Sequence, residues 1–413
     1  MMKTRLHSIP RFALPYNTDD FMAAFDALRH GPPAPESFAL LGDSPKFWTA
    51  SGRQALRLLL TSLNLPAGSG VALPLFTDPS LASAIVAAGH RPVFIDVDAQ
   101  TLTMDPSSLA AASGQYSALV IVHLFGQVAD IPGLLAVAGN VPVIEDTAHA
   151  PLSFLLGRMV GEFGLASFYS FASTKYWTAG GGGLAVVHDP DVAKRMVREV
   201  QTLISPSRTL EFRNLVLQAA KSVVFSRSAY GFLGKPMRRW ADGWALLEPS
   251  LDMLTIKRTQ AAAAHRQASR FPLRVEQQRA NSLRLLSHLS KADDVVLPHE
   301  RQGARYNYHL FPVLLRDRRE RDAVRAAMWR HFVDTSTIYS DSIDRSMKFG
   351  YRGGCPVSES VATRLITLPN YAALDNAEID TVAQVFLSSL RICRSARRTY
   401  PALSIGQHLP VQK

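Results

Sequence analysis

Between residues 48 and 188 the chain alternates short apolar runs with segments whose apolar residues recur at helical spacing. The short runs predict buried strands, because strands covered on both faces of a parallel sheet read as continuous apolar stretches. They span residues 68–75, 92–97, 118–124, 141–144, 166–171 and 183–188. The segments between them predict helices at 54–63, 80–88 and 106–112. This alternation predicts an α/β domain with a mainly parallel sheet.

The pattern changes after residue 189. Helical periodicity is then found at 192–203, 259–289, 320–332 and 376–390, with one strand-like run at 306–315. We therefore expect a large α/β domain at 47–248 and a smaller C-terminal α+β domain at 249–394. An N-terminal arm at 1–46 precedes them, and we expect the tail at 395–413 to be poorly ordered.

A basic and apolar stretch at 205–245 interrupts this organisation. Within 210–240, apolar residues such as Phe225 and Trp240 interleave with basic ones such as Lys221 and Arg239. Such a mixture suits an interfacial helix on an acidic membrane or an acidic, lipid-like substrate. It equally suits a helical excursion that packs at a subunit interface, and both interpretations stay open.

Composition and charge limit the classes of function. Of the 413 residues 47% are hydrophobic, enough for a sizeable core, and the formal charge is +11. That charge allows a nucleic acid, an acidic membrane or a phosphorylated substrate and selects none of them. No nucleic-acid-binding module is recognisable, so we expect no nucleic-acid partner.

The two cysteines, Cys355 and Cys393, cannot build a disulfide framework or a four-thiolate zinc site. We expect no metal and a reducing compartment. The chain has no apolar run of the ~18–20 residues that would span a bilayer, and its first residues lack the apolar core of a signal peptide. A cytoplasmic location, with peripheral membrane contact through 210–240 as an alternative, is therefore expected.

Three polar segments lie where an α/β sheet can carry chemistry. At 49–54 a small-residue turn opens into a helix, and the N–H groups at a helix start suit a phosphate. Asp146 follows an apolar strand, at the edge where such sheets bind ligands. Lys175 follows the next strand, where an unpaired lysine is costly unless it is functional. Taken singly, each has an ordinary alternative: helix caps by Ser51 and Asp146, and a lysine that reaches out to solvent.

The order and spacing of these segments are more informative than any one of them. Lys175 lies 29 residues after Asp146, and four glycines follow at 180–183. The glycines permit a close backbone approach to a ligand or a partner subunit, or form a flexible hairpin turn. Pyridoxal 5'-phosphate (PLP) needs a lysine for its aldehyde, an acid for its pyridinium nitrogen and a cup for its phosphate. The arrangement therefore predicts a PLP site.

At this point the sequence resembles a known family, the DegT/StrS-type sugar aminotransferases, a fold type I group of PLP enzymes. The resemblance covers residues 47–390 apart from 205–254. The matching segments are SGRQAL at 51–56, GHRPVFIDVDAQTLTMDP at 89–106, VHLFGQVADI at 122–131, VIEDTAHA at 143–150, GEFGLASFYSFASTKYWTAGGGGLAVV at 161–187 and LITLPNYAALDNAEIDTVAQVF at 365–386. The resemblance implies a large domain with a mainly parallel sheet flanked by helices, and a smaller C-terminal α+β domain.

The resemblance also implies roles for individual residues. Lys175 matches the lysine that forms the Schiff base with the cofactor and then shuttles a proton. Asp146 matches the acid that keeps the pyridine nitrogen protonated, and His149 a position near the cofactor's 3-hydroxyl. His123, in the matching VHLFG segment, is expected to support a strand end rather than to act as a catalyst.

The phosphate group is expected at the turn of Gly52 and Arg53 and at the hydroxyl of Ser170. The amides of the turn would bind it. The side chain of Arg53 would add charge there or point toward a neighbouring subunit.

Three positions depart from the family's pattern. Asp78 stands where the family usually carries an aromatic ring that stacks on the cofactor, so either Phe76 takes over the stacking or the site is built differently. Gly181 replaces a usual Glu. The Tyr-Asn segment that usually reaches the neighbouring subunit's phosphate should fall near Met253 and Leu254, where no Asn occurs.

The resemblance implies an aminotransferase that moves an amino group from an amino acid, glutamate in the family, to a keto group on a sugar. We expect that sugar to be nucleotide-linked and the product to serve polysaccharide or glycoconjugate biosynthesis. A homodimer with a shared active site is expected. Two alternatives remain: an acceptor that is a lipid-linked or other non-nucleotide ketone at a membrane surface, favoured by 210–240, and a non-catalytic regulator or scaffold with this fold, favoured by the three departures.

Overall fold

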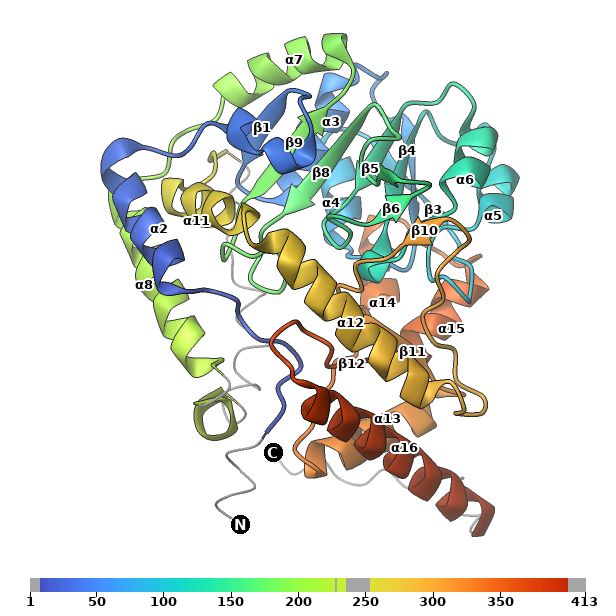
Figure 1. The fold of residues 1–413 in the computed structure, drawn as a ribbon. Coiled ribbons are helices and arrows are strands. Elements are labelled where there is room, and N and C mark those ends of the chain that lie inside the picture. Colours follow the sequence, from blue (N-terminus) through green and yellow to red (C-terminus); the bar gives the residue numbers. More distant parts are fainter. Residues whose placement is uncertain (1–7, 227–228, 235–252, 400–413) are drawn as a thin grey trace.

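A seven-stranded sheet forms the centre of the molecule (Figure 1), and the computed structural model describes residues 8–226, 229–234 and 253–399. The strand order is β1-β9-β8-β5-β4-β2-β3. Neighbouring strands are parallel from β8 to β3, whereas β9 runs antiparallel to both of its neighbours. The bounds are β1 (Lys46–Thr49), β2 (Gly70–Pro74), β3 (Arg91–Ile95), β4 (Ala118–Val122), β5 (Val143–Asp146), β8 (Ala166–Ser170) and β9 (Gly183–Val187). The predicted strands between residues 68 and 188 and the mainly parallel sheet are confirmed.

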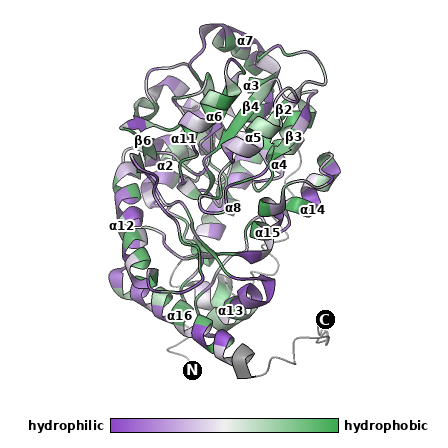
Figure 2. Ribbon diagram, turned by 90° about the vertical axis from the view of Figure 1, so that its right-hand side faces the viewer, coloured by the Kyte–Doolittle hydropathy of each residue, from purple (hydrophilic) through white to green (hydrophobic). Residues whose placement is uncertain are grey.

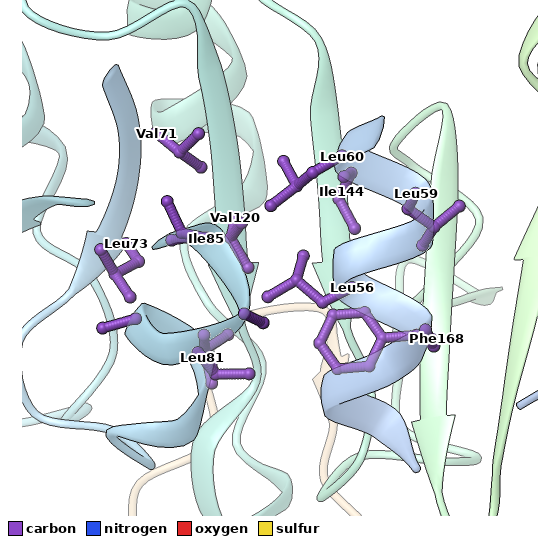
Figure 3. Packing of buried hydrophobic residues seen from close by; sticks show 14 of the residues in the cluster. Leu56, Leu59, Leu60, Val71, Leu73, Leu81, Ile85, Val120, Ile144 and Phe168 are labelled. Carbon is purple, nitrogen blue, oxygen red and sulfur yellow. The ribbon is translucent and has the colours of Figure 1, made fainter. Parts of the chain in front are cut away.

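Alternate residues of each strand contact different layers of helices. Val120 of β4 packs with Leu56 and Ile85 in a cluster formed with α3 (Gly52–Ser62), α4 (Ser80–Ala87) and α7 (Pro190–Gln201), part of which is shown in Figure 3. The next residue, Ile121, packs on the other face with α5 (Pro106–Ala111) and α6 (Ile131–Ala138). Because side chains alternate across a strand, a run apolar at every position buries both faces. β4, Ala118–Val122, is such a run, and Figure 2 colours it hydrophobic.

The helices of this domain begin where side chains satisfy their first N–H groups. The Ser51 hydroxyl accepts a hydrogen bond from the Gln54 N–H at the start of α3. Asp105, Asp130 and Asp189 accept in the same way at the starts of α5, α6 and α7. Helix starts lack intrahelical acceptors for these groups, so the caps fix where each helix begins after its strand.

The C-terminal part packs around a second apolar cluster. Strands β11 (Phe311–Leu314) and β12 (Leu365–Leu368) pair antiparallel, and α12 (Phe271–Leu289), α13 (Arg318–Arg330) and α16 (Asn376–Thr399) pack with them. Helices α14 (Ser342–Ser346) and α15 (Pro356–Arg364) complete this part. The expected long helical region at 259–289 is two helices, α11 (Arg258–Ala268) and α12. The division at residue 249, which lies outside the described residues, stays a prediction.

Helix α12 packs against both parts of the molecule. Near its start, Phe271 and Val275 pack with Trp177 of the large domain, whereas Leu285 and Leu289 near its end pack in the second cluster. In Figure 1 this helix runs from the neighbourhood of the central sheet to α16.

The N-terminal arm contacts both parts of the molecule. Ile9 bridges to Val333 in parallel, and its N–H donates to the Phe332 carbonyl at 2.8 Å. Helix α2 (Thr18–His30) then packs against α11 and α8 (Arg208–Val224). Residues 10–17 therefore cross from one part to the other.

Two expected elements differ from the structure in extent. The strand expected at 306–315 is confined to β11, because residues 306–310 turn away and Tyr308 has a positive φ of 51°. Helix α16 extends to Thr399, beyond the expected start of the tail at 395; residues 400–413 lie outside the described residues. A small sheet joins β6 (Phe154–Leu155), β7 (Arg158–Met159) and β10 (Ala304–Arg305).

Among the described residues, no helix combines the length and the apolar character that a membrane span requires.

Leu56→Ala should destabilise the protein by about 2–5 kcal/mol, because it leaves a cavity where α3 meets the sheet. Urea unfolding followed by circular dichroism measures the change. The matched control is Leu283→Ala on α12, whose side chain is 44% exposed and whose loss should cost about 0.5 kcal/mol or less. Equal shifts in the two variants would contradict the assigned core.

Candidate active site

Three of the expected site residues meet beyond the carboxyl ends of β5 and β8. Asp146 is the last residue of β5, and Lys175 follows β8 after a short turn. The Lys175 Nζ lies 2.7 Å from Nε2 of His149. Asp146 and His149 are buried, and Lys175 lies in the wall of a cavity of about 470 Å³. The structure therefore brings Asp146, His149 and Lys175 together at one edge of the sheet, and their roles stay predictions.

The hydrogen bonds around His149 assign its proton. The Phe125 N–H donates to Nδ1 of His149 at 3.2 Å. Burial, with the nearby Lys175, lowers the pKa of His149 well below its ordinary value, so the ring is neutral and carries one proton. That proton must lie on Nε2, which then donates to the Lys175 Nζ. The Lys175 Nζ lies against this nitrogen, and burial lowers the pKa of the amine, so its unprotonated, nucleophilic form is more accessible than in an exposed lysine.

Burial and the neighbouring carboxylates shift the pKa of Lys175 in opposite directions. Burial lowers the pKa of Lys175, whereas the carboxylates of Asp78 and Asp146 raise it. Burial also raises the pKa of Asp146 to about 6, against the effects of Lys175 and of the hydrogen bond from the Ala148 N–H. A protonated ring nitrogen placed against Asp146 would favour its ionised form.

Tyr339 and His309 lie beside these residues although the sequence analysis did not identify them. The Tyr339 hydroxyl lies 3.3 Å from Nε2 of His149, and the two rings are stacked 6.1 Å apart. The His309 ring lies 4.5 Å from that of His149, and burial lowers its pKa to about 3. Both residues come from loops of the C-terminal part, so no local motif connects them with Lys175.

The position of the stacking ring stays a prediction. Asp78 accepts a hydrogen bond from the Ser80 N–H at 2.9 Å and adds negative charge near Lys175. Phe76 is fully buried and packs against Phe125 and Tyr339.

A cradle suited to a phosphate lies at the start of α3. A Cβ added at Gly52 would lie 3.0 Å from the Cβ of Ser170, so the backbone of the turn and the end of β8 approach closely. The N–H groups of Gly52 and Arg53 belong to the first turn of the helix, where they have no intrahelical acceptor. An amine, a buried carboxylate and an anion cradle are therefore present together, and the residues fit PLP.

Glu145 and His123 support the site from behind. The Glu145 carboxylate is fully buried and accepts hydrogen bonds from the N–H groups of Gly161, Phe163 and Gly164 and from Nε2 of His123, at 2.6–3.0 Å. The Ala129 N–H donates to the other ring nitrogen of His123 at 3.2 Å. Burial opposes the charge of Glu145, but these donors together lower its pKa. His123 has the structural surroundings expected of it.

The glycine run is closely packed rather than loose. Gly180, Gly181 and Gly182 all have positive φ, and a Cβ on Gly181 would collide with the side-chain amide of Gln260. A glutamate at this position would meet the same amide. At the other departure, the Leu254 carbonyl accepts a hydrogen bond from the Gln54 side chain at 2.8 Å, and Met253 is 59% exposed.

Comparison with known proteins identifies relatives across most of the chain. A model of the DegT/DnrJ/EryC1/StrS aminotransferase family matches residues 38–387. A UDP-N-acetyl-3-dehydro-alpha-D-glucosamine 3-aminotransferase of Acidithiobacillus ferrooxidans is 27% identical over 351 residues, 83% of each chain. A pleiotropic regulatory protein of Geobacillus stearothermophilus is 27% identical over 344 residues, 81% of this chain and 82% of that one.

The fold is also shared with solved structures. One of them is Spr1654 from Streptococcus pneumoniae, described as a sugar aminotransferase and solved in its PLP form. It matches with a TM-score of 0.74 and 20% sequence identity, over 94% of this chain and 99% of that one. At this identity the likeness shows the fold alone, and it confirms the expected fold type I architecture.

The environment of Lys175 predicts a shifted pH dependence. In the cofactor-free protein, trapping of Lys175 by a small aldehyde and borohydride should have its midpoint below pH 10.5, the ordinary lysine value, because burial makes the unprotonated amine available at lower pH. Mass spectrometry of the peptide containing Lys175 measures it. The same lysine in the urea-unfolded chain is the control, and coincident midpoints would contradict the lowered pKa of the Lys175 amine.

Proposed function

The chain belongs to the DegT/DnrJ/EryC1/StrS aminotransferase family and is a PLP-dependent aminotransferase, and we propose that it transfers an amino group from an amino acid to the keto group of a sugar. The observation that supports the proposal best is the Lys175 amine with its lowered pKa, 2.7 Å from Nε2 of His149 and close enough to Asp146 for each to shift the other's pKa. The family and the relative that acts on a UDP-linked keto sugar support a nucleotide-linked acceptor. We propose glutamate as the donor and polysaccharide or glycoconjugate biosynthesis as the use of the product.

Each site residue has a task that follows from its chemistry. When bound, PLP supplies an aldehyde and a ring that withdraws electrons from the carbon attached to the amino nitrogen. Lys175 Nζ takes the proton from the α-carbon of the donor and returns it elsewhere on the same reacting system. Asp146 would hold the protonated ring nitrogen, and His149 would lie near the ring oxygen.

The remaining residues bind and orient. The N–H groups of Gly52 and Arg53 and the hydroxyl of Ser170 would hold the phosphate at the start of α3. Phe76 packs against the ring of Tyr339 beside the site. Asp78 adds negative charge that opposes loss of the Lys175 proton. Because the family builds its site between two subunits, we propose a homodimer. We also propose a cytoplasmic location.

One surface favours the second candidate acceptor, a lipid-linked ketone at a membrane. On α8 the apolar side chains of Phe212, Val216 and Val223 are exposed at helical spacing, and the same helix carries the basic Arg213 and Lys221. Such a face suits an acidic membrane or a second copy of the chain. The rest of the basic and apolar stretch, from residue 235 onward, lies outside the described residues.

A non-catalytic regulator with the same fold is the third candidate. The regulatory protein of Geobacillus stearothermophilus is similar over most of its length, and the departures at Asp78, Gly181 and Met253 favour this possibility. The retained Lys175 and Asp146 argue against it, because a silent binder needs neither.

The absorbance of the protein with PLP separates these possibilities. Wild type should show a band near the visible edge that borohydride bleaches, and Lys175→Ala should not, because it lacks the amine. Adding L-glutamate should replace this band with that of the pyridoxamine form of the cofactor. Asp146→Ala should slow this conversion by about 100- to 1000-fold, the typical effect of removing one preorganised charged group. The control is Asp191→Ala, on the surface of α7. A wild-type band that no amino acid converts would favour the regulator.

Membrane attachment is tested by flotation with acidic liposomes. Arg213→Glu/Lys221→Glu should lower recovery in the liposome fraction several-fold, because each basic residue near an acidic surface contributes roughly 1 kcal/mol. Lys194→Glu, on the exposed side of α7, is the matched charge control. Equal recovery of the double variant and wild type would reject the membrane hypothesis for α8.

A further inference from the structure

Arg274 shares the cavity of Lys175. The cavity is lined by the N-terminal arm at 11–15, by α12 and by the loop at 370–373, and Lys175 and His309 lie in its wall. Arg274 belongs to the first turns of α12 and faces the same space. It was not identified from the sequence, because nothing near it in the chain indicates a site.

The guanidinium of Arg274 is fixed to the residue that follows Lys175. Its Nη2 donates to the Tyr176 carbonyl at 3.1 Å, and the Tyr176 hydroxyl donates to the Arg274 carbonyl. The guanidinium carbon also lies 5.3 Å from the centre of the Tyr176 ring and 6.0 Å from that of Phe271. These contacts hold the cation in one place relative to Lys175 and leave little rotamer freedom to be lost on binding.

The charge of Arg274 lacks the partner that its neighbours have. Around α12, Arg270 pairs with Asp20, Arg279 with Glu300 and Arg284 with Asp380. Among the described residues no carboxylate forms an ion pair with Arg274, and its buried Nη1 makes no hydrogen bond. Burial lowers the pKa of Arg274 to about 10, so it stays a cation at neutral pH. Asp20, which pairs with Arg270, favours the cation from outside ion-pair distance. A buried cation without a directly paired counter-ion is costly, and an anionic ligand would offset that cost.

We propose that Arg274 binds the α-carboxylate of the amino donor. This inference rests on the proposed aminotransferase function. In an α-amino acid the carboxylate and the reacting nitrogen are attached to one carbon. A donor that reacts beside Lys175 therefore places its carboxylate within a few ångströms of the Lys175 amine. Arg274 lines the same cavity and is held next to Lys175 by its hydrogen bond to the Tyr176 carbonyl. Its Nη1 has no hydrogen-bond acceptor and can donate to a ligand. A planar guanidinium suits a carboxylate particularly well.

The test is the donor half-reaction of the holoenzyme, followed by the change in PLP absorbance. Arg274→Gln should raise the KM for L-glutamate by about 10- to 100-fold, the typical effect of losing one charge-assisted hydrogen bond. Arg274→Lys should raise it less, because it keeps the charge without the fork of donors. Arg284→Gln, which removes a guanidinium from the same helix far from the cavity, should leave the KM within threefold.

A comparison of two donors isolates the α-carboxylate. 4-Aminobutyrate is glutamate without that group, so its kcat/KM should change less than threefold in Arg274→Gln. If Arg274→Gln lowers kcat/KM equally for both donors, or leaves the KM for L-glutamate within threefold of wild type, the proposal is overturned. Arg274→Lys decides the question if Arg274→Gln has a lowered Tm.

A binding measurement keeps this proposal separate from the proposed function. Saturation-transfer NMR with glutarate, an unreactive dicarboxylate, should give a signal with PLP-loaded wild type and Arg284→Gln, and none with Arg274→Gln. If wild type converts no amino acid but shows this pattern, the proposed function fails and the carboxylate site stands. An equal glutarate signal in wild type and Arg274→Gln overturns the site, whatever the activity.

Discussion

An amine that is taken out of water must lose its proton or gain a partner, and the site is arranged around this constraint on Lys175. Two carboxylates nearby favour its charged form, while burial and the Nε2–H of His149 favour the neutral one. The orientation of His149 depends in turn on the N–H of Phe125, which has a positive φ of 61°. A strained peptide between β4 and α6 therefore orients the ring that lies against a lysine following β8. Strain of this kind costs about 1–3 kcal/mol and persists only where the surrounding packing imposes it.

The neighbouring pair of acids in β5 shows how one strand serves support and chemistry together. Side chains alternate across the sheet, so Glu145 and Asp146 point to opposite faces. The Glu145 carboxylate accepts hydrogen bonds from three N–H groups of the loop at 161–164 and from the ring of His123. The Asp146 carboxylate accepts one N–H and faces the site. A buried carboxylate that lost these donors would be costly, so the loop and the strand end hold each other in place.

The sequence predicted the parts of the molecule whose signals are local. Apolar runs revealed the strands of the central sheet, and Ser51, Asp146 and Lys175 could be found because each follows a recognisable strand or begins a helix. Tyr339, His309 and Arg274 could not be found in this way, because only the packing of the C-terminal part brings them to Lys175. The glycines at 180–183 had two interpretations, and only the positions of Gln218 and Gln260 show that the run is tightly packed. Patterns along the chain report burial and caps, whereas the wall of a cavity depends on contacts between distant segments.

The path of the N-terminal arm has a consequence for the order in which the molecule is made. Residues 11–15 are synthesised long before α12 and the loop at 370–373, yet they lie against both, and Ile9 is anchored at Val333. The central sheet, with Lys175 and Asp146, is complete by residue 187. The cavity beside them acquires its last wall only after most of the chain has been translated. A nascent chain thus displays its reactive lysine to the surrounding solution before the chamber around that lysine exists, and closing a loop of this length delays the final docking further.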